Sequence, residues 1–358
     1  LQLARYPIHW HIIGDGQGQY IRNSSIHDTY SRCVTVHGTN NVRVENNVTF
    51  NAVGHCFFLE DGIETGNQFI RNLGIQTKCH PTLPCEPTNL TLAHQSTKGQ
   101  ESDQILIPSD NTVSTFWITN PDNIYRDNVA AGSDQIGFWF AIPQHPTGAF
   151  EGTEISKNTW PGRARLREFS GNVAHSNFDG LMLDRGQRPD GRFGIAGPNL
   201  TSYADPADTS SDLVLAVFDN FTGYKNRNGA IWGRGEYHLY KNLKLADNAI
   251  GFTHASGIPG IAPFTSRVVD SLFVGETDNI GNPTTPEEIA YGRSLPAASA
   301  DFPIRGYEYY DFHHEVENTK FVNYVPNARR DAGALSYLLF TSFGMRTENS
   351  VKGLTFVN

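Results

Sequence analysis

Short apolar stretches that end in a charged residue or a histidine, beside a glycine, recur along the chain. The first is RYPIHWHIIGDG, and SRCVTVHGTNN, GHCFFLEDGIE, FDGLMLDRG and NGAIWGRG follow the same pattern. Side chains alternate between the two faces of a strand, so His9 and His11 are expected on one face and Trp10 on the other. The pattern predicts short strands, each with a polar position at its end.

A second pattern repeats through the sequence: an aromatic or aliphatic residue, a variable residue, Asn or Asp, and a short apolar step. Early copies begin at Tyr20, Val44 and Phe69, about 24 residues apart, which suits one turn of a solenoid. The repeats predict an all-β fold, a right-handed parallel β-helix that forms a single domain over residues 1–358. Asn side chains at a recurring turn are expected to pair with the turns above and below, and an isolated turn former is the alternative for any one copy. The copies are YIRNSSI, VENNVTF, FIRNLGI, YRDNVAA, FSGNVAH, FDNFTGY, YKNLKLA, VDSLFVG and VENTKFV.

Composition agrees with strands and turns rather than helices. The chain has 34 Gly and 19 Pro, and only 18% of its residues are charged. Insertions rich in Pro, Gly and Ser fall at 80–112, 143–165 and 187–212. The segment ARRDAGALSYLLF has the best helical composition, although its apolar end suits a strand equally well. Leu1 in place of Met predicts a fragment of a larger extracellular protein.

The formal net charge of −9 argues against a nucleic-acid partner. An acidic ligand would need a local strip of basic residues. No stretch is long and apolar enough to span a bilayer, and no signal peptide opens the sequence, so any membrane contact is expected through flanking regions. The sequence contains no indication of an oligomeric state.

Cysteines and sequons indicate an oxidising, extracellular compartment. Cys79 and Cys85 bracket HPTLP, a loop that a disulfide would close. Cys33 and Cys56 occupy matching places in adjacent repeats, and the sequence leaves open whether they are bonded. Sequons predict glycosylation of a secreted or cell-surface protein at Asn23, Asn47, Asn89, Asn199 and Asn220.

If the strands stack in parallel, their polar ends form a ladder beside the first histidine pair, made of His37, Glu60, Asp184 and Arg234. Imidazoles are ligands of transition metals such as Zn²⁺, and the alternative is hydrogen bonding to neighbouring turns. The candidate metal ligands are His9, His11, His37 and His55. Calcium prefers oxygen ligands, which Asp15, Glu60, Asp61 and Glu64 can supply, although oxygen-rich turns are also common without an ion.

The ladder also contains the groups that cleavage of a polysaccharide requires. Glycoside hydrolysis needs a proton donor and a base or nucleophile, for which Glu60, Asp61 and Asp184 are the candidates. A β-elimination needs a base, His11 or His37, and a stabilising cation, Arg185 or Arg234. The sequence does not separate the two reactions, and turn capping is the alternative role for Asp61 and Asp184. The candidate substrate-binding residues are Arg185, Arg234 and His254.

Several of these segments carry a family resemblance: RYPIHWHIIGDG, SRCVTVHGTNN, GHCFFLEDGIE, HSNFDGLMLD, NGAIWGRG, ADNAIGFTHAS and FPIRGYEYYD. They resemble the parallel β-helix region of the family that contains the cell migration-inducing hyaluronan-binding protein, the transmembrane cell-surface hyaluronidase and fibrocystin-L. The resemblance implies an extracellular β-helix and, for the first two members, calcium-dependent breakdown of hyaluronan. Fibrocystin-L is better regarded as receptor-like or structural. The expected function is therefore binding, with cleavage, of hyaluronan or another acidic polysaccharide. The alternatives are binding without turnover and a structural ectodomain.

Overall fold

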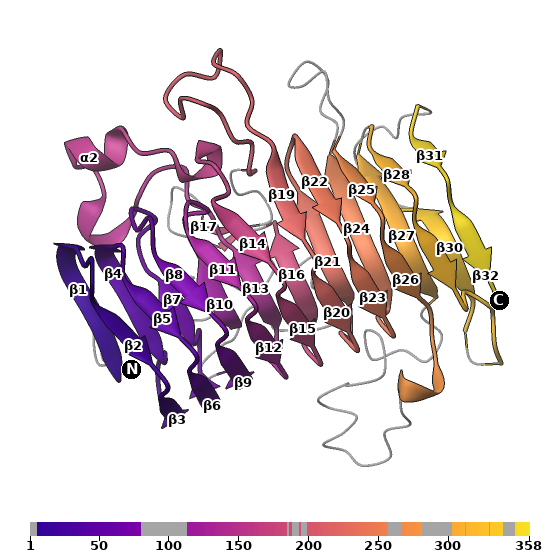
Figure 1. The fold of residues 1–358 in the computed structure, drawn as a ribbon, viewed down its shortest axis with the longest axis horizontal. Coiled ribbons are helices and arrows are strands. Elements are labelled where there is room, and N and C mark those ends of the chain that lie inside the picture. Colours follow the sequence, from indigo (N-terminus) through magenta and orange to yellow (C-terminus); the bar gives the residue numbers. More distant parts are fainter. Residues whose placement is uncertain are drawn as a thin grey trace.

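Three parallel sheets wind around one interior, and each sheet has ten strands (Figure 1). The predicted right-handed parallel β-helix is confirmed. The structure is a computed structural model, and it describes residues 6–79, 113–184, 186–187, 193–194, 199–256, 266–280, 303–311, 313–328, 330–338 and 348–358. Each coil contributes one strand to each sheet, in the order first, second, third sheet.

The first sheet is made of β1 (Ile8–Asp15), β4 (Val34–Asn40), β7 (Phe57–Leu59), β10 (Ser114–Ile118), β13 (Ile136–Phe140), β16 (Asp179–Leu183), β21 (Gly229–Arg234), β24 (Ile250–Ser256), β27 (Ile304–Asp311) and β30 (Ala332–Tyr337). The second sheet is made of β2 (Tyr20–Arg22), β5 (Arg43–Glu45), β8 (Gln68–Ile70), β11 (Ile124–Arg126), β14 (Glu168–Ser170), β19 (Ala216–Asp219), β22 (His238–Lys241), β25 (Arg267–Val269), β28 (Glu315–Glu317) and β31 (Ser350–Lys352). The third sheet is made of β3 (Ser25–Thr29), β6 (Val48–Val53), β9 (Leu73–Lys78), β12 (Val129–Ala131), β15 (Val173–His175), β20 (Thr222–Tyr224), β23 (Lys244–Ala246), β26 (Leu272–Val274), β29 (Lys320–Val322) and β32 (Thr355–Val357).

Short elements lie in the segments between the sheets. The insertion after β13 forms η2 (Gly148–Phe150), α2 (Glu154–Lys157) and η3 (Pro161–Arg163), beside the β1 and β4 end of the molecule (Figure 1). The sequence patterns did not predict these helices. A small antiparallel pair joins β17 (Gly186–Gln187) to β18 (Phe193–Gly194), and η4 (Asp278–Ile280) follows β26. Within the segment with the best helical composition, Ala332–Tyr337 form the strand β30, which pairs with β27.

One turn has the same length in every coil. Two residues join each strand of the second sheet to the following strand of the third sheet. The first of the two has a positive φ, as in Asn23, Asn46, Arg71, Asp127 and Asn220, and Asn adopts this conformation more readily than most residues. The repeated Asn or Asp of the sequence is therefore explained largely by the positive φ that the turn requires of its first residue.

The second turn position forms a ladder of amides. Nδ2 of Asn47 donates to Oδ1 of Asn72 (2.9 Å), Asn72 to Asn128 (3.0 Å) and Asn128 to Asn172 (3.1 Å). All four side chains are buried, so the ladder satisfies polar groups that burial would otherwise leave unpaired. The predicted pairing of Asn side chains between stacked turns is confirmed for these four copies.

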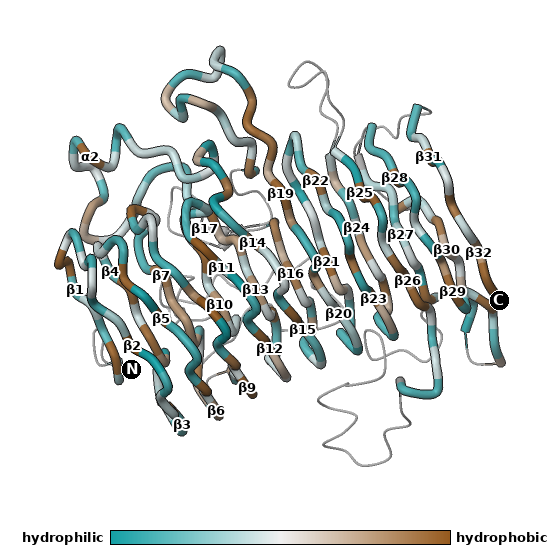
Figure 2. The backbone as a smooth tube through the Cα atoms, viewed as in Figure 1, coloured by the Kyte–Doolittle hydropathy of each residue, from teal (hydrophilic) through white to brown (hydrophobic). Residues whose placement is uncertain are grey.

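Hydrophobic positions recur along the backbone of successive coils (Figure 2). In the first sheet, Phe57, Phe116 and Phe138 stack inside the helix with ring centroids 4.6 and 4.5 Å apart. Alternate residues of the same strands form a second buried cluster, which includes Phe58, Trp117, Trp139, Met182 and Trp232. The first sheet therefore buries apolar side chains on both faces, as expected for a parallel sheet covered on both sides.

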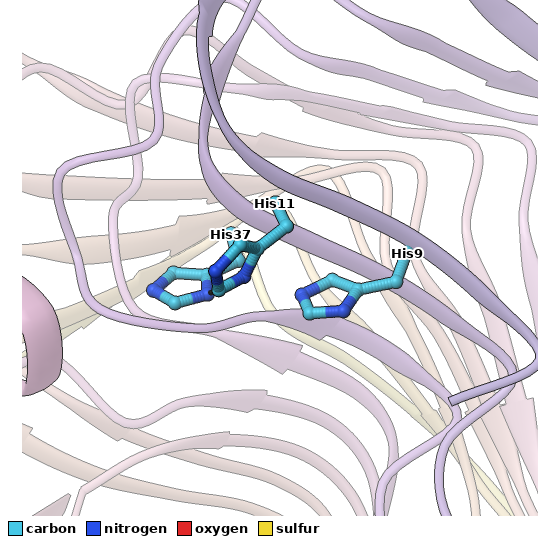
Figure 3. A group of neighbouring side chains, drawn as sticks. All are labelled: His9, His11 and His37. Carbon is cyan, nitrogen blue, oxygen red and sulfur yellow. Dashed lines mark hydrogen bonds between the residues drawn. The ribbon is translucent and has the colours of Figure 1, made fainter. Parts of the chain in front are cut away.

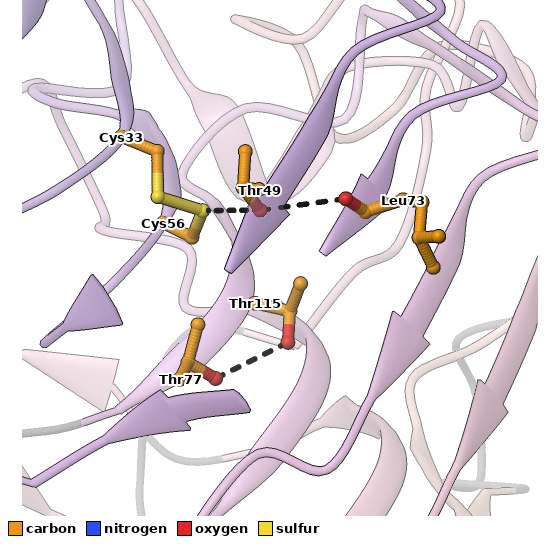
Figure 4. The surroundings of a disulfide bond; sticks show 6 residues. All are labelled: Cys33, Thr49, Cys56, Leu73, Thr77 and Thr115. Atoms are coloured by element: carbon orange, nitrogen blue, oxygen red, sulfur yellow. Dashed lines mark hydrogen bonds between the residues drawn. A yellow bond between two sulfur atoms is a disulfide. The ribbon is translucent and has the colours of Figure 1, made fainter. Parts of the chain in front are cut away.

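A disulfide joins the coils that contain β4 and β7. Cys33 and Cys56 directly precede these strands and are bonded to each other (Figure 4), which answers the question that the sequence left open. Thr49 Oγ1 lies 3.0 Å from Cys56 Sγ and donates to the carbonyl of Leu73. The bond is buried in the main core, where it holds two successive coils together.

Candidate functional site

Three histidines from two adjacent strands meet at the edge of the first sheet (Figure 3). His9 and His11 lie in β1 on either side of Trp10, whose ring is buried and whose Nε1 donates to Gln19. Strand alternation therefore places both imidazoles on the opposite face, as predicted. The register of β1 and β4 pairs His11 with His37, which brings the third imidazole to the same place.

His37 is the centre of the polar contacts in this site. Its Nε2 lies 2.8 Å from Oδ2 of Asp61, and its Nδ1 lies 3.1 Å from Nδ1 of His11. Oε2 of Glu60 lies 3.5 Å from His37 Nδ1 and 3.9 Å from His9 Nε2. Glu60 and Asp61 directly follow β7, so three neighbouring strands of one sheet build the site.

Burial and mutual charge change the proton affinities of these groups. Burial raises the pKa of Glu60 to about 7, although the nearby His37 opposes this shift. Burial, with the neighbouring His11 and His37, lowers the pKa of His9 to about 4. Burial alone would lower the pKa of His37, but its hydrogen bond to Asp61 and the charge of Glu60 outweigh burial and raise it. The site therefore combines a carboxyl that can be protonated near neutral pH with an imidazole that favours its charged form.

Glu64 builds the turn that presents Glu60 and Asp61. Its fully buried carboxylate accepts hydrogen bonds from the backbone N–H groups of Gly38 (2.8 Å), Asp61 (3.2 Å) and Gly62 (2.8 Å). Glu64 is one of the candidate calcium ligands predicted from the sequence, and in the structure its oxygens anchor the backbone of this turn. Asp15, also assigned to calcium, accepts from Gln17 N and Asn41 Nδ2.

The insertion after β13 closes one side of the site. Thr147 N donates to the carbonyl of Asp61 (2.9 Å), and the ring of Phe150 lies 6.5 Å from that of His37. Gly148 has φ +57°, and a Cβ on it would lie 2.1 Å from Oδ1 of Asp61. No pattern in the sequence indicated Gly148 or Phe150, because an insertion has no repeat partner from which its position could be inferred.

The predicted ladder is present but divides into two groups. Asp184 and Arg234 occupy the ladder position after β16 and in β21, and Arg234 Nε donates to Asp184 Oδ1 (3.1 Å). Between them and Glu60 lie β10 and β13, which carry Thr119 and Ala141 at this position. Three strand spacings, about 14 Å, therefore separate Asp184 from Glu60, and the structure does not bring Asp184 to the histidines.

Two other predicted site residues are buried elsewhere. His55 precedes β7 whereas Glu60 follows it, so the two lie at opposite ends of this strand. The His55 ring is fully buried, with Nδ1 2.7 Å from Ser114 Oγ. His254 occupies an inward position of β24, and its Nδ1 lies 2.6 Å from the hydroxyl of Tyr307. Neither side chain reaches the group around His37.

The remaining predictions concern glycosylation sites and residues outside the described part of the chain. Asn23 and Asn220 are exposed and Asn199 is half-buried. Asn47 is fully buried, and its Nδ2, the atom that would carry a glycan, donates to Ile21 O and Asn72 Oδ1, so the folded ladder excludes a glycan there. The predicted residues that lie outside the described part of the chain are Cys85, the intended partner of Cys79, together with Asn89 and Arg185.

In the part of the chain that the structure describes, no helix is long and apolar enough to cross a membrane.

Comparison with known proteins places the chain among β-helix proteins. Over 99% of its length the chain is 33% identical to the cell surface hyaluronidase CEMIP2 of Homo sapiens and 34% identical to the human cell migration-inducing and hyaluronan-binding protein. It spans only 27% and 28% of those two proteins. It is also 32% identical to human fibrocystin-L, over 78% of the chain and 6% of that protein.

A family model gives the assignment. The model described as the CEMIP beta-helix matches residues 1–182, which include β1, β4, β7 and all the residues around His37. The resemblance noted in the sequence is thereby confirmed. The chain belongs to the CEMIP β-helix family.

Proposed function

We propose that this chain is the β-helix of an extracellular protein that binds hyaluronan and depolymerises it by glycoside hydrolysis at the site around His37. Two relatives support the substrate, because their names refer to hyaluronan and each aligns with 99% of the chain. The family match covers every residue of the site. The candidate catalytic residues are Glu60, Asp61, His11 and His37.

The observation that carries the proposal is that two carboxyl groups in different environments, those of Glu60 and Asp61, lie beside His37. Burial keeps the pKa of Glu60 at about 7, so this carboxyl can give a proton to a leaving glycosidic oxygen. Asp61 is the second carboxyl: its Oδ2 bonds to His37, while its main-chain carbonyl accepts from Thr147 N. His11 is exposed, so it is the imidazole of this site that a polymer or a water molecule reaches first.

The test is the chain length of high-molecular-mass hyaluronan after incubation with the purified protein. Shortening without the ultraviolet absorbance of an unsaturated uronate is the result expected for hydrolysis. Shortening with that absorbance would replace hydrolysis by β-elimination. An intact polymer, or a His37→Ala variant as active as the parent chain, would overturn the proposal of cleavage at this site. His27→Ala is the matched control, since His27 is an exposed histidine paired with Asp28 in β3.

The second candidate function is hyaluronan binding without cleavage, or a structural role like that considered for fibrocystin-L. One observation favours it: Asp184, a predicted catalytic acid, pairs with Arg234 three strand spacings from Glu60 and four from His37. Retention on immobilised hyaluronan with no shortening of the free polymer would identify a binding module. Absence of both would identify a structural ectodomain.

An extracellular location is part of the proposal. The Cys33–Cys56 disulfide supports it, because such bonds persist in oxidising compartments. Exposed sequons at Asn23 and Asn220 support glycosylation. Calcium dependence of cleavage, which the family resemblance implies, is tested by comparing the polymer assay with and without added Ca²⁺.

A further inference from the structure

We propose that His9, His11, His37 and Glu60 form a binding site for one divalent transition-metal ion of the zinc class. The three imidazoles each offer a nitrogen, and these ligand atoms all lie within 4.8 Å of one another. Figure 3 shows the three rings gathered at the edge of β1 and β4. The proposal concerns an ion-bound state, in which Glu60 is a ligand rather than a proton donor, and it is tested without hyaluronan.

Glu60 completes the ligand set in place of the predicted His55. Its Oε2 lies 3.5 Å from His37 Nδ1 and 3.9 Å from His9 Nε2, while His11 Nδ1 lies 3.1 Å from His37 Nδ1. Ligands about 2.0–2.2 Å from a tetrahedral zinc ion are separated from one another by about 3.3 Å. The distances between these side chains are therefore already close to those that a bound ion requires.

Among the residues that the structure describes, two buried atoms of this group have no hydrogen-bond partner. They are His9 Nε2 and Glu60 Oε2, which lie within 3.9 Å of each other. A buried polar atom without a partner destabilises a fold, and two such atoms face each other here. An ion between the two atoms would satisfy both.

Asp61 orients His37 for this role. Its carboxylate accepts a hydrogen bond from Nε2–H of His37 at 2.8 Å, so in the neutral imidazole that binds an ion the proton stays on Nε2 and the lone pair lies on Nδ1. Nδ1 is the atom that faces His11 and Glu60. A carboxylate behind a ligating histidine is the usual outer support of a zinc-bound imidazole.

The donor set favours a transition metal over calcium at this position. Three of the four ligand atoms are imidazole nitrogens, whereas calcium takes six to eight oxygens. Two of the carboxylates assigned to calcium, Asp15 and Glu64, already accept hydrogen bonds from other groups. The fit to zinc therefore rests on both the identity and the spacing of the ligands.

The test is a titration of the untagged, chelator-treated chain with Co²⁺, a spectroscopic substitute for Zn²⁺. We expect the visible absorption of tetrahedral cobalt to saturate at one ion per chain and to disappear when Zn²⁺ is added. His9→Ala and Glu60→Gln should each weaken binding at least tenfold, and Asp61→Asn should weaken it by about 10–100-fold. Circular dichroism of each variant shows whether it is folded.

His27→Ala is the control, because His27 lies exposed in β3 and pairs with Asp28. Saturation far below one ion per chain would overturn the proposal. Unchanged affinity in folded His9→Ala would also overturn it, as would an equal loss in His27→Ala. None of these results uses hyaluronan, so the metal proposal and the proposed function can fail separately.

Discussion

His37 and Asp61 share a hydrogen bond of 2.8 Å between Nε2 and Oδ2, and this bond decides which nitrogen of His37 faces the rest of the site. Both side chains are buried, so solvent does not replace either partner readily. The turn held by Glu64 and the segment around Gly148 fix Asp61 from two further sides. The orientation of His37 therefore depends on residues from β4, the turn after β7 and the insertion after β13.

Replacing Asp61 with Asn tests this dependence. The amide can present an N–H group to Nε2, which would move the imidazole proton to Nδ1 and turn the lone pair away from Glu60. We expect the rate of hyaluronan shortening to fall by about 10–100-fold with little loss of folded protein. Asp219→Asn, which alters a carboxylate in the second sheet, should leave the rate unchanged. Equal rates for the parent chain and Asp61→Asn would contradict the assignment.

A pair of glycine variants separates damage to the site from backbone strain. Gly148 and Gly152 both have positive φ, +57° and +73°, so alanine costs each about 1–2 kcal/mol of stability. Only at Gly148 would the new Cβ meet Asp61, at 2.1 Å, because nothing lies within 4 Å of a Cβ at Gly152. We expect Gly148→Ala to lose cleavage activity and Gly152→Ala to keep it. Matching activities would show that this loop does not position Asp61.

Removing the Cys33–Cys56 disulfide should destabilise the fold. The bond closes a loop with a sequence separation of 23 residues, and loop-closure entropy for that length corresponds to about 3 kcal/mol. The double variant Cys33→Ala/Cys56→Ala should unfold at lower urea concentration with a similar slope. An unchanged midpoint would mean that stacking alone holds these two coils. The double substitution is preferable to a reducing agent, which would act on every disulfide of the chain.

Acid should destabilise the protein through buried histidines. Burial lowers the pKa of His238 to about 4 and that of His314 to about 3, so both are neutral in the fold at pH 5 but charged in the unfolded chain. Above the unfolded-state pKa of about 6.5 both histidines are neutral in the folded and the unfolded chain, so their protonation does not lower the free energy of unfolding. Below that pH, each histidine lowers the free energy of unfolding by about 1.4 kcal/mol per pH unit. Urea unfolding at pH 7 and pH 5 measures this decline. His238→Gln should show a shallower pH dependence than the parent chain, and an equal slope would contradict it.

The presence of a glycan should depend on whether the Asn side chain of the sequon is exposed, and not on the sequon alone. In protein secreted from eukaryotic cells, we expect glycans at Asn23 and Asn220 but none at Asn47, whose amide lies inside the Asn ladder. Mass spectrometry of peptides after enzymatic removal of glycans reports each position. A glycan on Asn47 of folded protein would show that the first coils do not stack as described.

Much of the fold and part of the site could be predicted because they depend on repetition. Alternation placed His9 and His11 on one face, and parallel stacking placed His37 beside them. The separation of Asp184 from Glu60 was missed although the copies YRDNVAA and FSGNVAH mark two coils between them, because the first-sheet strands of those coils are followed by Thr119 and Ala141, which are neither charged nor histidine. His254 was predicted to bind substrate, whereas its position in β24 points inward, toward Tyr307.

The two-residue turn between the second and third sheets limits where this fold can vary. Because that turn has one length in every coil, all the long connections leave from the two ends of the first sheet. Lengthening a surface connection costs little, roughly 0.6 kcal/mol for each doubling of its length, whereas altering the fixed turn would shift the register of a whole coil. Connections of different lengths can therefore be exchanged at the ends of the first-sheet strands, one of which carries His37, while the register of the coils is kept. Diversification of such a protein would proceed by loop replacement at one sheet.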